Sequence, residues 1–367
     1  MLKNFPEKVF VDRKVWKKER TRRILKNVED VPCVIIDNVE TLINKYSRKP
    51  DPVGEGKKVL WITEQKGDFV KPCPCTPAYL GCCYYIINLD LNCPFDCTYC
   101  ILQHYLTNPL ITTNVNLNDL WKQLDEFLDG IKGRFIRIGT GELADSLALD
   151  HITGNSRDLI AYFRGKKNVH FELKTKSVNI DNILMEEPEE NIVVSWSLNS
   201  EEMALKTEAD APSIDARLEA AAKVCRRGFR IGFHFDPLFY YSGFAGNYDR
   251  VIKRMFQAVP PSRIAWISLG SLRFPPFLKR IIQNRFPKSR MLIEELVPGK
   301  DGKYRYFMPL RKKLYEKTVH SLRKYGGEKI LLYFCMEGRN MWNEIIGWKP
   351  RGKEDIEKYL SFPQEMS

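Results

Sequence analysis

The sequence predicts an α/β protein whose main domain is an open barrel of six strand–helix units. A small α/β cap precedes the barrel, and a hairpin and helix extension follows it. From residue 84 onward, apolar runs of strand length alternate with amphipathic helix patterns, which is typical of a parallel sheet covered by helices. Six units are two fewer than a closed barrel of the TIM type contains. The expected fold is therefore a partial (βα)6 TIM-type barrel.

The cap is expected over residues 1–83. A basic stretch at 14–26 has a helix-like pattern, and residues 46–57, rich in proline, glycine and charge, favour a loop. Short apolar runs predict three strands, at 9–11, 34–36 and 60–63.

The barrel is expected over residues 84–287. Its six strands are predicted at 84–89, 135–138, 169–174, 192–197, 230–235 and 264–269. The helices between and after them are predicted at 116–129, 155–164, 179–186, 213–227, 246–257 and 275–285.

The C-terminal extension is expected over residues 288–367. The turn dipeptides Pro298-Gly299 and Asp301-Gly302 separate short apolar pieces, which favours a hairpin or a long loop. A basic helix at 310–325 and a last strand at 329–335 follow.

Composition limits the possible locations and chemistry of the chain. Of its 367 residues, 44% are hydrophobic, so a large packed core is expected. There is no apolar run of 18 residues and no apolar signal segment at the start, so we expect a cytoplasmic protein without membrane contact. Seven of the ten cysteines lie between Cys73 and Cys100, and in this compartment they favour metal or redox chemistry over disulfides.

The net charge of +12 is unevenly distributed. Residues 273–324 carry 15 Lys or Arg against 4 Asp or Glu, and the first 24 residues carry 9 against 3. A basic excess confined to two segments predicts a face that binds a polyanion. The alternative is an ordinary solvated surface.

The chemistry is expected to centre on Cys93, Cys97 and Cys100, which form a C-x₃-C-x₂-C array after the first barrel strand. Three thiolates can hold a [4Fe–4S] cluster and leave one iron open to a substrate or cofactor. Zinc is the alternative, with His104 as a fourth ligand. We interpret the array as the signature of radical S-adenosylmethionine (SAM) enzymes, with these cysteines as the metal ligands and catalytic residues.

Further candidate residues follow other barrel strands, at the edge where a parallel barrel places its active site. Glycines allow close approach of the backbone, a glutamate can pair with a ligand ammonium group, and Lys, Ser and Asn can bind a carboxylate and a ribose. The predicted SAM contacts are Tyr99, Gly141, Glu142, Lys176, Ser197 and Asn199.

Four more cysteines, Cys73, Cys75, Cys82 and Cys83, precede the array. Their C-x-C-x₆-C-C spacing is poor for zinc, which prefers two C-x₂₋₄-C pairs. A second metal site is one interpretation, and buried or incidental thiols are the other.

The chain resembles the spore photoproduct lyase family of radical SAM enzymes over nearly its whole length, as a divergent member. The matching stretches are residues 71–74, the cysteine array with Tyr99 and residues 102–103, and residues 150–153, 175–176, 197–199, 215–221 and 228–233. The resemblance implies a carbon–carbon lyase for DNA repair. With a reduced [4Fe–4S] cluster, it would cleave SAM to a 5′-deoxyadenosyl radical that reverses a thymine dimer lesion.

The resemblance also implies binding partners and substrate contacts. Arg305 and Tyr306 match the lesion-contacting pair, and the basic C-terminal face fits DNA. Reduction of the cluster requires a reductase with a flavodoxin- or ferredoxin-type electron donor.

Two positions depart from the family pattern. The family has a hydrogen-donating cysteine after the second strand, where this chain has Gly139 or Thr140, and a tyrosine where this chain has Ile101. The donor is left open between Cys335, another tyrosine and regenerated SAM. The alternative functions are the same chemistry on another nucleic-acid or non-DNA substrate, and a cluster-bearing nucleic-acid-binding protein without turnover.

Overall fold

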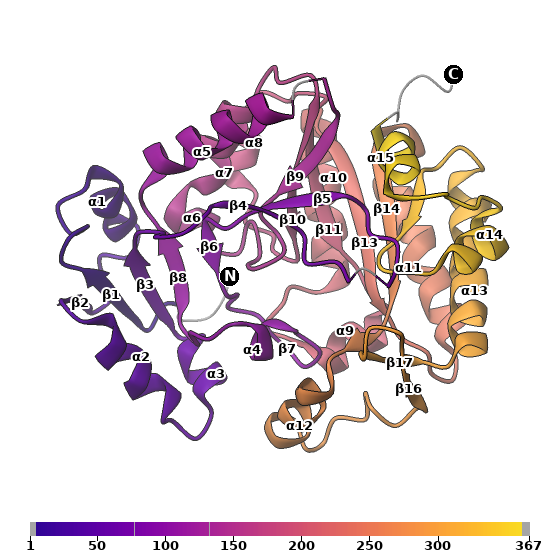
Figure 1. Cartoon of the computed structure of the whole chain (residues 1–367), viewed down its shortest axis with the longest axis horizontal. Helices are drawn as coiled ribbons and strands as arrows, with labels where there is room; N and C mark the ends of the chain where they lie inside the picture. The colour runs from indigo at the N-terminus through magenta and orange to yellow at the C-terminus, as the bar shows by residue number, and fades with distance from the viewer. Residues whose placement is uncertain (1–4, 77, 132, 362–367) are drawn as a thin grey trace.

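The computed structural model describes residues 5–76, 78–131 and 133–361, and it has the expected α/β architecture (Figure 1). Its largest sheet has eight strands, of which all but the edge strand β4 run parallel. Their order is β4 (Val70–Pro72), β5 (Tyr84–Ile87), β9 (Ile136–Gly139), β10 (Val169–Thr175), β11 (Ile192–Ser197), β13 (Arg230–Leu238), β14 (Ile264–Ser271) and β18 (Leu332–Phe334), written from β4 to the opposite edge. The six predicted barrel strands are confirmed, and the predicted last strand joins them as β18. The sheet is curled but has two edges, so the partial TIM-type barrel is confirmed.

Burial on both faces explains why these strands could be predicted from the sequence. Every residue of β11 and of β14 is buried, and such strands read as continuous apolar runs. The outer helices include α5 (Leu117–Gly130), α7 (Asn155–Phe163), α8 (Asp181–Met185), α10 (Ile214–Arg227) and α11 (Phe244–Ala258). The ends of α10 follow capping rules: the Ser213 side chain accepts from the Ala216 N–H, and Gly228 follows with φ of 114°.

The helix that follows β14 differs from the prediction. α12 (Pro276–Arg285) packs mainly against α4 (Leu102–Tyr105), whereas α13 (Met308–Gly326) packs against α11 and β14. The assignment of residues 275–285 to the sixth barrel unit is therefore wrong. An amphipathic pattern shows that a helix has a buried face, but it does not identify the surface that covers this face.

A second sheet lies beside the barrel, at the indigo end of Figure 1. Its order is β2 (Cys33–Ile36), β1 (Lys8–Asp12), β3 (Val59–Thr63), β8 (Ile111–Asn114) and β6 (Asp90–Leu91). The three predicted cap strands are confirmed. Strands β8 and β6 come from beyond residue 83, so the sheet unites two parts of the chain; the domain limits stay a prediction.

The helices of this N-terminal part are α1 (Glu19–Lys26), α2 (Val39–Ser47) and α3 (Pro52–Gly56). The loop predicted at 46–57 is wrong, because α3 lies within it. Asp51 caps α3 by accepting from the Gly54 N–H, and Pro52 occupies the first turn, where a missing N–H costs little.

The predicted hairpin is also present. Strands β16 (Leu296–Pro298) and β17 (Tyr304–Tyr306) are antiparallel, and β15 (Arg273–Phe274) pairs with β17. Gly302 lies in the turn with φ of 74°, which favours glycine. The remaining elements are α6 (Asp150–Thr153), α9 (Glu201–Thr207), α14 (Arg339–Ile346), α15 (Lys353–Ser361), η1 (Pro261–Arg263), β7 (Asp96–Cys97) and β12 (Glu208–Ala209). Among the described residues, no helix has the length and apolarity needed to cross a bilayer.

The connection from β4 to β5 reaches across the open side of the barrel. Leu80 in this connection donates its backbone N–H to the carbonyl oxygen of Glu337, just after β18, at 3.1 Å. The bond between Leu80 and Glu337 therefore joins the two sides of the gap between the edge strands.

Candidate active site

The loop that carries the cysteine array is fixed by several polar side chains. Lys57 is buried, and its Nζ donates to the carbonyl oxygens of Cys93 and Phe95, each at 2.7 Å. Gln103 Nε2 donates to the carbonyl oxygen of Cys97 at 3.1 Å. The Arg285 guanidinium of α12 contacts Asp96 at 2.9 Å. These contacts hold the backbone of the loop in a defined shape.

The three thiols of this loop lie in a sheltered environment. Cys97 is buried, and Cys93 and Cys100 are half-buried. Burial raises the pKa of Cys97 to about 12, and burial together with the Asp145 carboxylate raises that of Cys93. Thiolates are therefore disfavoured here unless a positive partner accompanies them.

The thiol set fits an iron–sulfur cluster, because cluster irons would supply that positive charge and each iron takes its own thiolate. No group of three His, Cys, Asp or Glu side chains in the described part of the chain is arranged to hold a single metal ion. The assignment of Cys93, Cys97 and Cys100 as cluster ligands stays a prediction.

A charged group adjoins the cysteine loop at the carboxyl ends of the strands. Strand β7 of the loop pairs with β12, which places Cys97 opposite Glu208. The Tyr99 hydroxyl donates to Glu208, and Arg217 of α10 contacts the same carboxylate at 2.6 Å. The Lys176 ammonium lies 5.6 Å from the centre of the Tyr99 ring.

The groups around Lys176 stabilise its positive charge. Burial opposes its charge, but Cys97 and Glu208 outweigh it and raise its pKa above the ordinary value. Asn199 is buried nearby; its Nδ2 lies 3.5 Å from Glu208, and its Oδ1 accepts from Tyr248 at 2.7 Å. The structure thus brings three of the predicted SAM contacts, Tyr99, Lys176 and Asn199, to one place beside Cys97.

Ser197 contributes to the candidate site through its backbone carbonyl group. Its carbonyl oxygen accepts from Arg217 at 3.0 Å, which ties the end of β11 to α10. Sequence reasoning missed Glu208 and Arg217 as site residues. An arginine within the matching stretch 215–221 was the available signal, because a buried arginine in a helix requires an acidic partner.

The glycine stretch after β9 is tightly packed. A Cβ atom at Gly139 would lie 2.1 Å from Tyr84 Oη and 2.2 Å from the Glu172 carbonyl oxygen, and one at Gly141 would lie 2.5 Å from Lys174 Cβ. No side chain fits at Gly139. The Thr140 hydroxyl, in turn, lies 2.7 Å from Ser146 Oγ.

Glu142, the predicted partner of a ligand ammonium, forms an ion pair with Lys174. Burial opposes the charge of Lys174, but Glu142 raises its pKa above the ordinary value. A ligand ammonium would have to share or replace this partner. The assignments of Gly141 and Glu142 stay predictions.

The predicted substrate contacts are both buried. Arg305 contacts Asp301 at 2.7 Å and lies 4.1 Å from the centre of the Tyr79 ring. Tyr306 packs near Tyr240, and burial raises its pKa. Both side chains are engaged within the protein, and their role as substrate contacts stays a prediction.

The barrel interior holds a charged network that sequence reasoning also missed. Glu172 Oε1 accepts from Ser195 at 2.5 Å and Trp266 at 3.0 Å, and it lies 2.8 Å from His234 Nε2. The Arg137 guanidinium lies 3.6 Å from Glu172. Polar residues inside otherwise apolar strands were the signal in the sequence that could have indicated this network. The network fills the barrel core.

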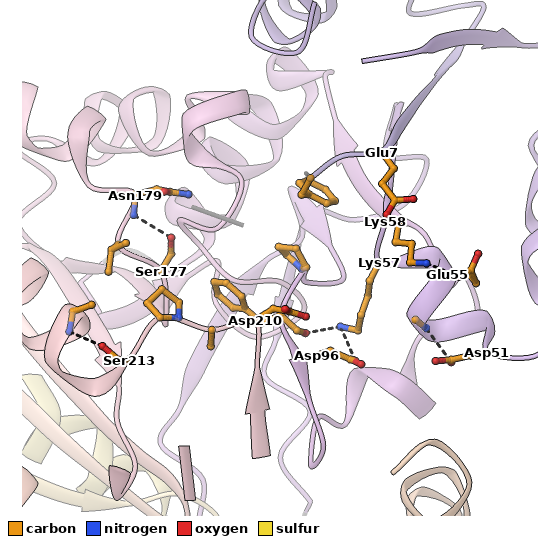
Figure 2. Close-up of a pocket in the computed structure, with 18 residues that line it drawn as sticks. Glu7, Asp51, Glu55, Lys57, Lys58, Asp96, Ser177, Asn179, Asp210 and Ser213 are labelled. Carbon is orange, nitrogen blue, oxygen red and sulfur yellow. Dashed lines mark hydrogen bonds and ion pairs between the residues drawn. The ribbon is translucent and has the colours of Figure 1, made fainter. Parts of the chain in front are cut away.

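A separate cavity of about 730 Å³ borders the outer side of the cysteine loop (Figure 2). It is lined by Asp96 of the loop, Lys57, and residues near Ser177 and Ser213. Figure 2 shows Lys57 pointing toward Asp96. None of the predicted site residues lines this cavity, and the candidate active site stays at the barrel mouth, where Tyr99, Lys176 and Asn199 lie beside Cys97.

Comparison with known proteins gives one family. A family model described as "Spore photoproduct lyase" matches residues 80–335. The spore photoproduct lyase of Geobacillus sp. (strain Y412MC61) is 28% identical over 215 residues, 58% of this chain and 63% of that protein. That of Bacillus subtilis (strain 168) is 26% identical over 245 residues, 65% of this chain and 70% of that protein. The chain thus spans less than two thirds of the Geobacillus relative.

Solved structures agree on the fold. A spore photoproduct lyase mutant with dinucleoside spore photoproduct is 22% identical and aligns with a TM-score of 0.80, covering 90% of this chain and all of the other. A spore photoproduct lyase complexed with dinucleoside spore photoproduct is 20% identical and has a TM-score of 0.77, covering 90% of this chain and 99% of the other.

Proposed function

The chain belongs to the spore photoproduct lyase family, and on that premise we propose that it is a radical SAM lyase that repairs a thymine dimer lesion in DNA. The observation that carries the proposal is the convergence of Tyr99, Lys176 and Asn199 on the cysteine loop. The ends of two strands, β10 and β11, and one loop, far apart in sequence, bring thiols, a cation and an amide to one edge of the barrel. This edge is where barrel enzymes place their chemistry.

Cys93, Cys97 and Cys100 would hold a [4Fe–4S] cluster. When bound, the cluster and SAM supply a 5′-deoxyadenosyl radical that removes a hydrogen atom from the lesion. The protein's own residues bind and orient SAM. Lys176 offers a cation to the SAM carboxylate, while Glu208 fixes the Tyr99 ring and neutralises Arg217. The buried setting keeps water away from a radical.

The test is anaerobic reconstitution with iron and sulfide, followed by dithionite and SAM. We expect 5′-deoxyadenosine by liquid chromatography, and release of thymines when the dinucleoside spore photoproduct is added. A reconstituted protein that forms no 5′-deoxyadenosine would contradict the enzyme proposal.

The same chemistry on a different substrate is the second candidate, and one observation favours it. Arg305, the predicted lesion contact, is already paired with Asp301 and stacked on Tyr79. Formation of 5′-deoxyadenosine without release of thymines from the dinucleoside would favour this candidate.

DNA and an electron donor are the proposed partners. Exposed basic side chains of α12, α13 and the segments around the hairpin would contact phosphates; they include Lys279, Arg280, Lys288, Arg290, Lys300, Lys313 and Lys317. A flavodoxin- or ferredoxin-type protein would reduce the cluster. A cytoplasmic location remains an expectation.

DNA binding should weaken steeply with salt. Each phosphate contact contributes about −0.9 to the slope of log K against log salt. We expect the double substitution Lys313→Gln and Lys317→Gln to reduce this slope by about two, as measured by fluorescence anisotropy on a short duplex. The matched control is Lys223→Gln on the distant helix α10. If the double substitution left the slope of log K against log salt unchanged, α13 would not be part of the proposed DNA-binding face.

A further inference from the structure

A large cavity lies at the amino-terminal ends of the barrel strands. Its volume is about 1150 Å³, and it is bordered by the first residues of β13 and β14, the segment before β18, the end of α13, and α15. β13 has nine residues, so at about 3.3 Å per residue its two ends are roughly 26 Å apart. In Figure 1, α15 lies at the top of these strands and β7 of the cysteine loop lies at the bottom. The cavity is therefore separate from the candidate active site at the carboxyl ends.

The cavity is strongly basic, with six cationic and two anionic side chains in its lining. The cations are Arg230, Arg323, Lys329, Lys349, Arg351 and Lys358, and the anions are Glu328 and Asp355. The Glu328 carboxylate lies 3.4 Å from Arg323. The Asp355 carboxylate lies 3.0 Å from Arg351, so each acid is matched by an arginine. The three lysines are exposed and form no ion pair with any described residue, so their charge makes the cavity attractive to an anion.

One cation of the lining is buried. Arg230 is 6% exposed, and its Nε has no hydrogen-bond partner among the described residues. Its guanidinium lies 3.3 Å from the Glu190 carboxylate, which also lies 3.2 Å from Arg263. One carboxylate shared by two guanidinium groups compensates the charge of Arg230 only in part. Because a buried charge is costly unless it is fully paired, a further anion in this cavity would be stabilising.

An aromatic ring lies among these cations. Trp348 lines the cavity and is half-buried; its ring centre is 4.7 Å from that of Tyr359 and 5.6 Å from that of Trp342. These two packing partners hold the indole in place. Apolar side chains of Ile264, Ile330, Leu331 and Ile346 also line the cavity. A fixed and partly accessible indole is a stacking surface for a flat ring.

We propose that this cavity binds a nucleoside phosphate, with the base against Trp348 and the phosphate among the three lysines. The ligand has to carry negative charge to match the lysines and Arg230, and it has to contain a flat ring to use the indole. A nucleoside phosphate has both, whereas inorganic phosphate and a peptide of Asp and Glu lack the ring. A volume of about 1150 Å³ has room for such a ligand. The proposal is independent of the proposed function, since binding alone tests it.

The same nucleoside phosphate unit occurs in a free nucleotide and in a single strand of nucleic acid. The test is therefore isothermal titration calorimetry of the anaerobically reconstituted full chain with ATP and, separately, with a short oligothymidylate. Excess SAM is present so that binding at the active site does not contribute. We expect saturable binding of at least one probe, and the probe that binds more tightly identifies the source of the ligand.

The double variant Lys329→Gln, Lys349→Gln should weaken this binding about tenfold or more, because two charge-assisted contacts to phosphate are lost. Both lysines are exposed, so the variant should fold as the wild type does. The matched control is Lys122→Gln, Lys223→Gln, which removes two exposed lysines outside the cavity and should keep the wild-type affinity.

A further variant separates recognition of the base from recognition of the phosphate. Trp348→Leu keeps an apolar side chain against Tyr359 but removes the stacking surface. It should lower the affinity for ATP about tenfold and leave the weaker affinity for inorganic triphosphate unchanged.

Four outcomes would overturn the proposal. The wild type binds neither probe, or the lysine double variant binds both as tightly as the wild type does. The control double variant loses affinity to the same extent, which would mean that the effect comes from net charge. Inorganic triphosphate or oligoglutamate binds the wild type as tightly as ATP does, which would mean that the cavity selects charge without a base.

Discussion

Replacement of Cys97 by Ala is expected to abolish the iron–sulfur absorbance of the reconstituted protein and to reduce 5′-deoxyadenosine formation to background. Cys97 is the buried central member of the array, and its loop strand is paired with β12. The substitution would leave a cluster with two of its three protein ligands. The neighbouring Lys176 and Glu208 could not replace the lost thiolate, because neither is a ligand that iron–sulfur clusters normally use. The expected iron content falls from about four per chain to near zero.

The matched control is Cys225→Ala, because Cys225 lies on the outer helix α10 and is half-buried without cysteine neighbours in the array. It should keep full iron content and activity. Circular dichroism should show the same helix content for both variants, since removal of one sulfur leaves the contacts of Lys57 and Gln103 to the loop backbone in place. Full iron binding by Cys97→Ala would refute the ligand assignment.

The barrel could be predicted because its strands are buried on both faces. β11 and β14 are apolar runs of strand length, and no exposed face interrupts the pattern. β8 was missed for the opposite reason: Thr112, Thr113 and Asn114 are polar yet buried, which a reading based on apolar runs does not detect. The placement of α12 was wrong because local pattern does not name a distant packing partner.

The site residues were likewise predictable only where the local sequence marks them. Lys176 and Asn199 could be picked out because each follows a barrel strand, and Tyr99 because it directly precedes Cys100; the topology brings such positions together. Glu208 could not, because nothing in the local sequence indicates that β12 pairs with the cysteine loop. The closeness of Cys73 and Cys75, whose Sγ atoms are 3.7 Å apart, was likewise hidden, since spacing alone does not tell whether two thiols face each other.

Replacement of Glu172 by Ala is expected to lower the free energy of unfolding by about 3–5 kcal/mol, as measured by urea denaturation. Glu172 is 1% exposed and, among the described residues, is the one carboxylate that forms an ion pair with Arg137. Its loss leaves the Arg137 guanidinium, 2% exposed, as a buried charge supported by the Tyr84, Trp266 and Tyr333 rings alone. Truncating one partner of a buried pair costs more than the pair itself contributes.

The pH dependence gives this prediction its sharpest form. Burial favours the neutral acid, but His234 and Arg137 outweigh burial and lower the pKa of Glu172 below its ordinary value of 4.5. A lowered carboxyl pKa contributes stability above the unfolded-state value, and this contribution is lost as the pH falls through the folded-state value. The stability difference between wild type and Glu172→Ala should therefore be constant at neutral pH and shrink below pH 4.5.

The control is Glu219→Ala, which removes an exposed carboxylate on α10 and should leave the free energy of unfolding nearly unchanged, because exposed ion pairs contribute little. The double variant Glu172→Ala, Arg137→Met removes both charges, so it should recover part of the loss, because an apolar pair of similar volume avoids an unpaired buried cation. A double variant less stable than Glu172→Ala would mean that Arg137 stabilises the barrel mainly through its stacking on Trp266, 4.0 Å away, and not through its charge pairing.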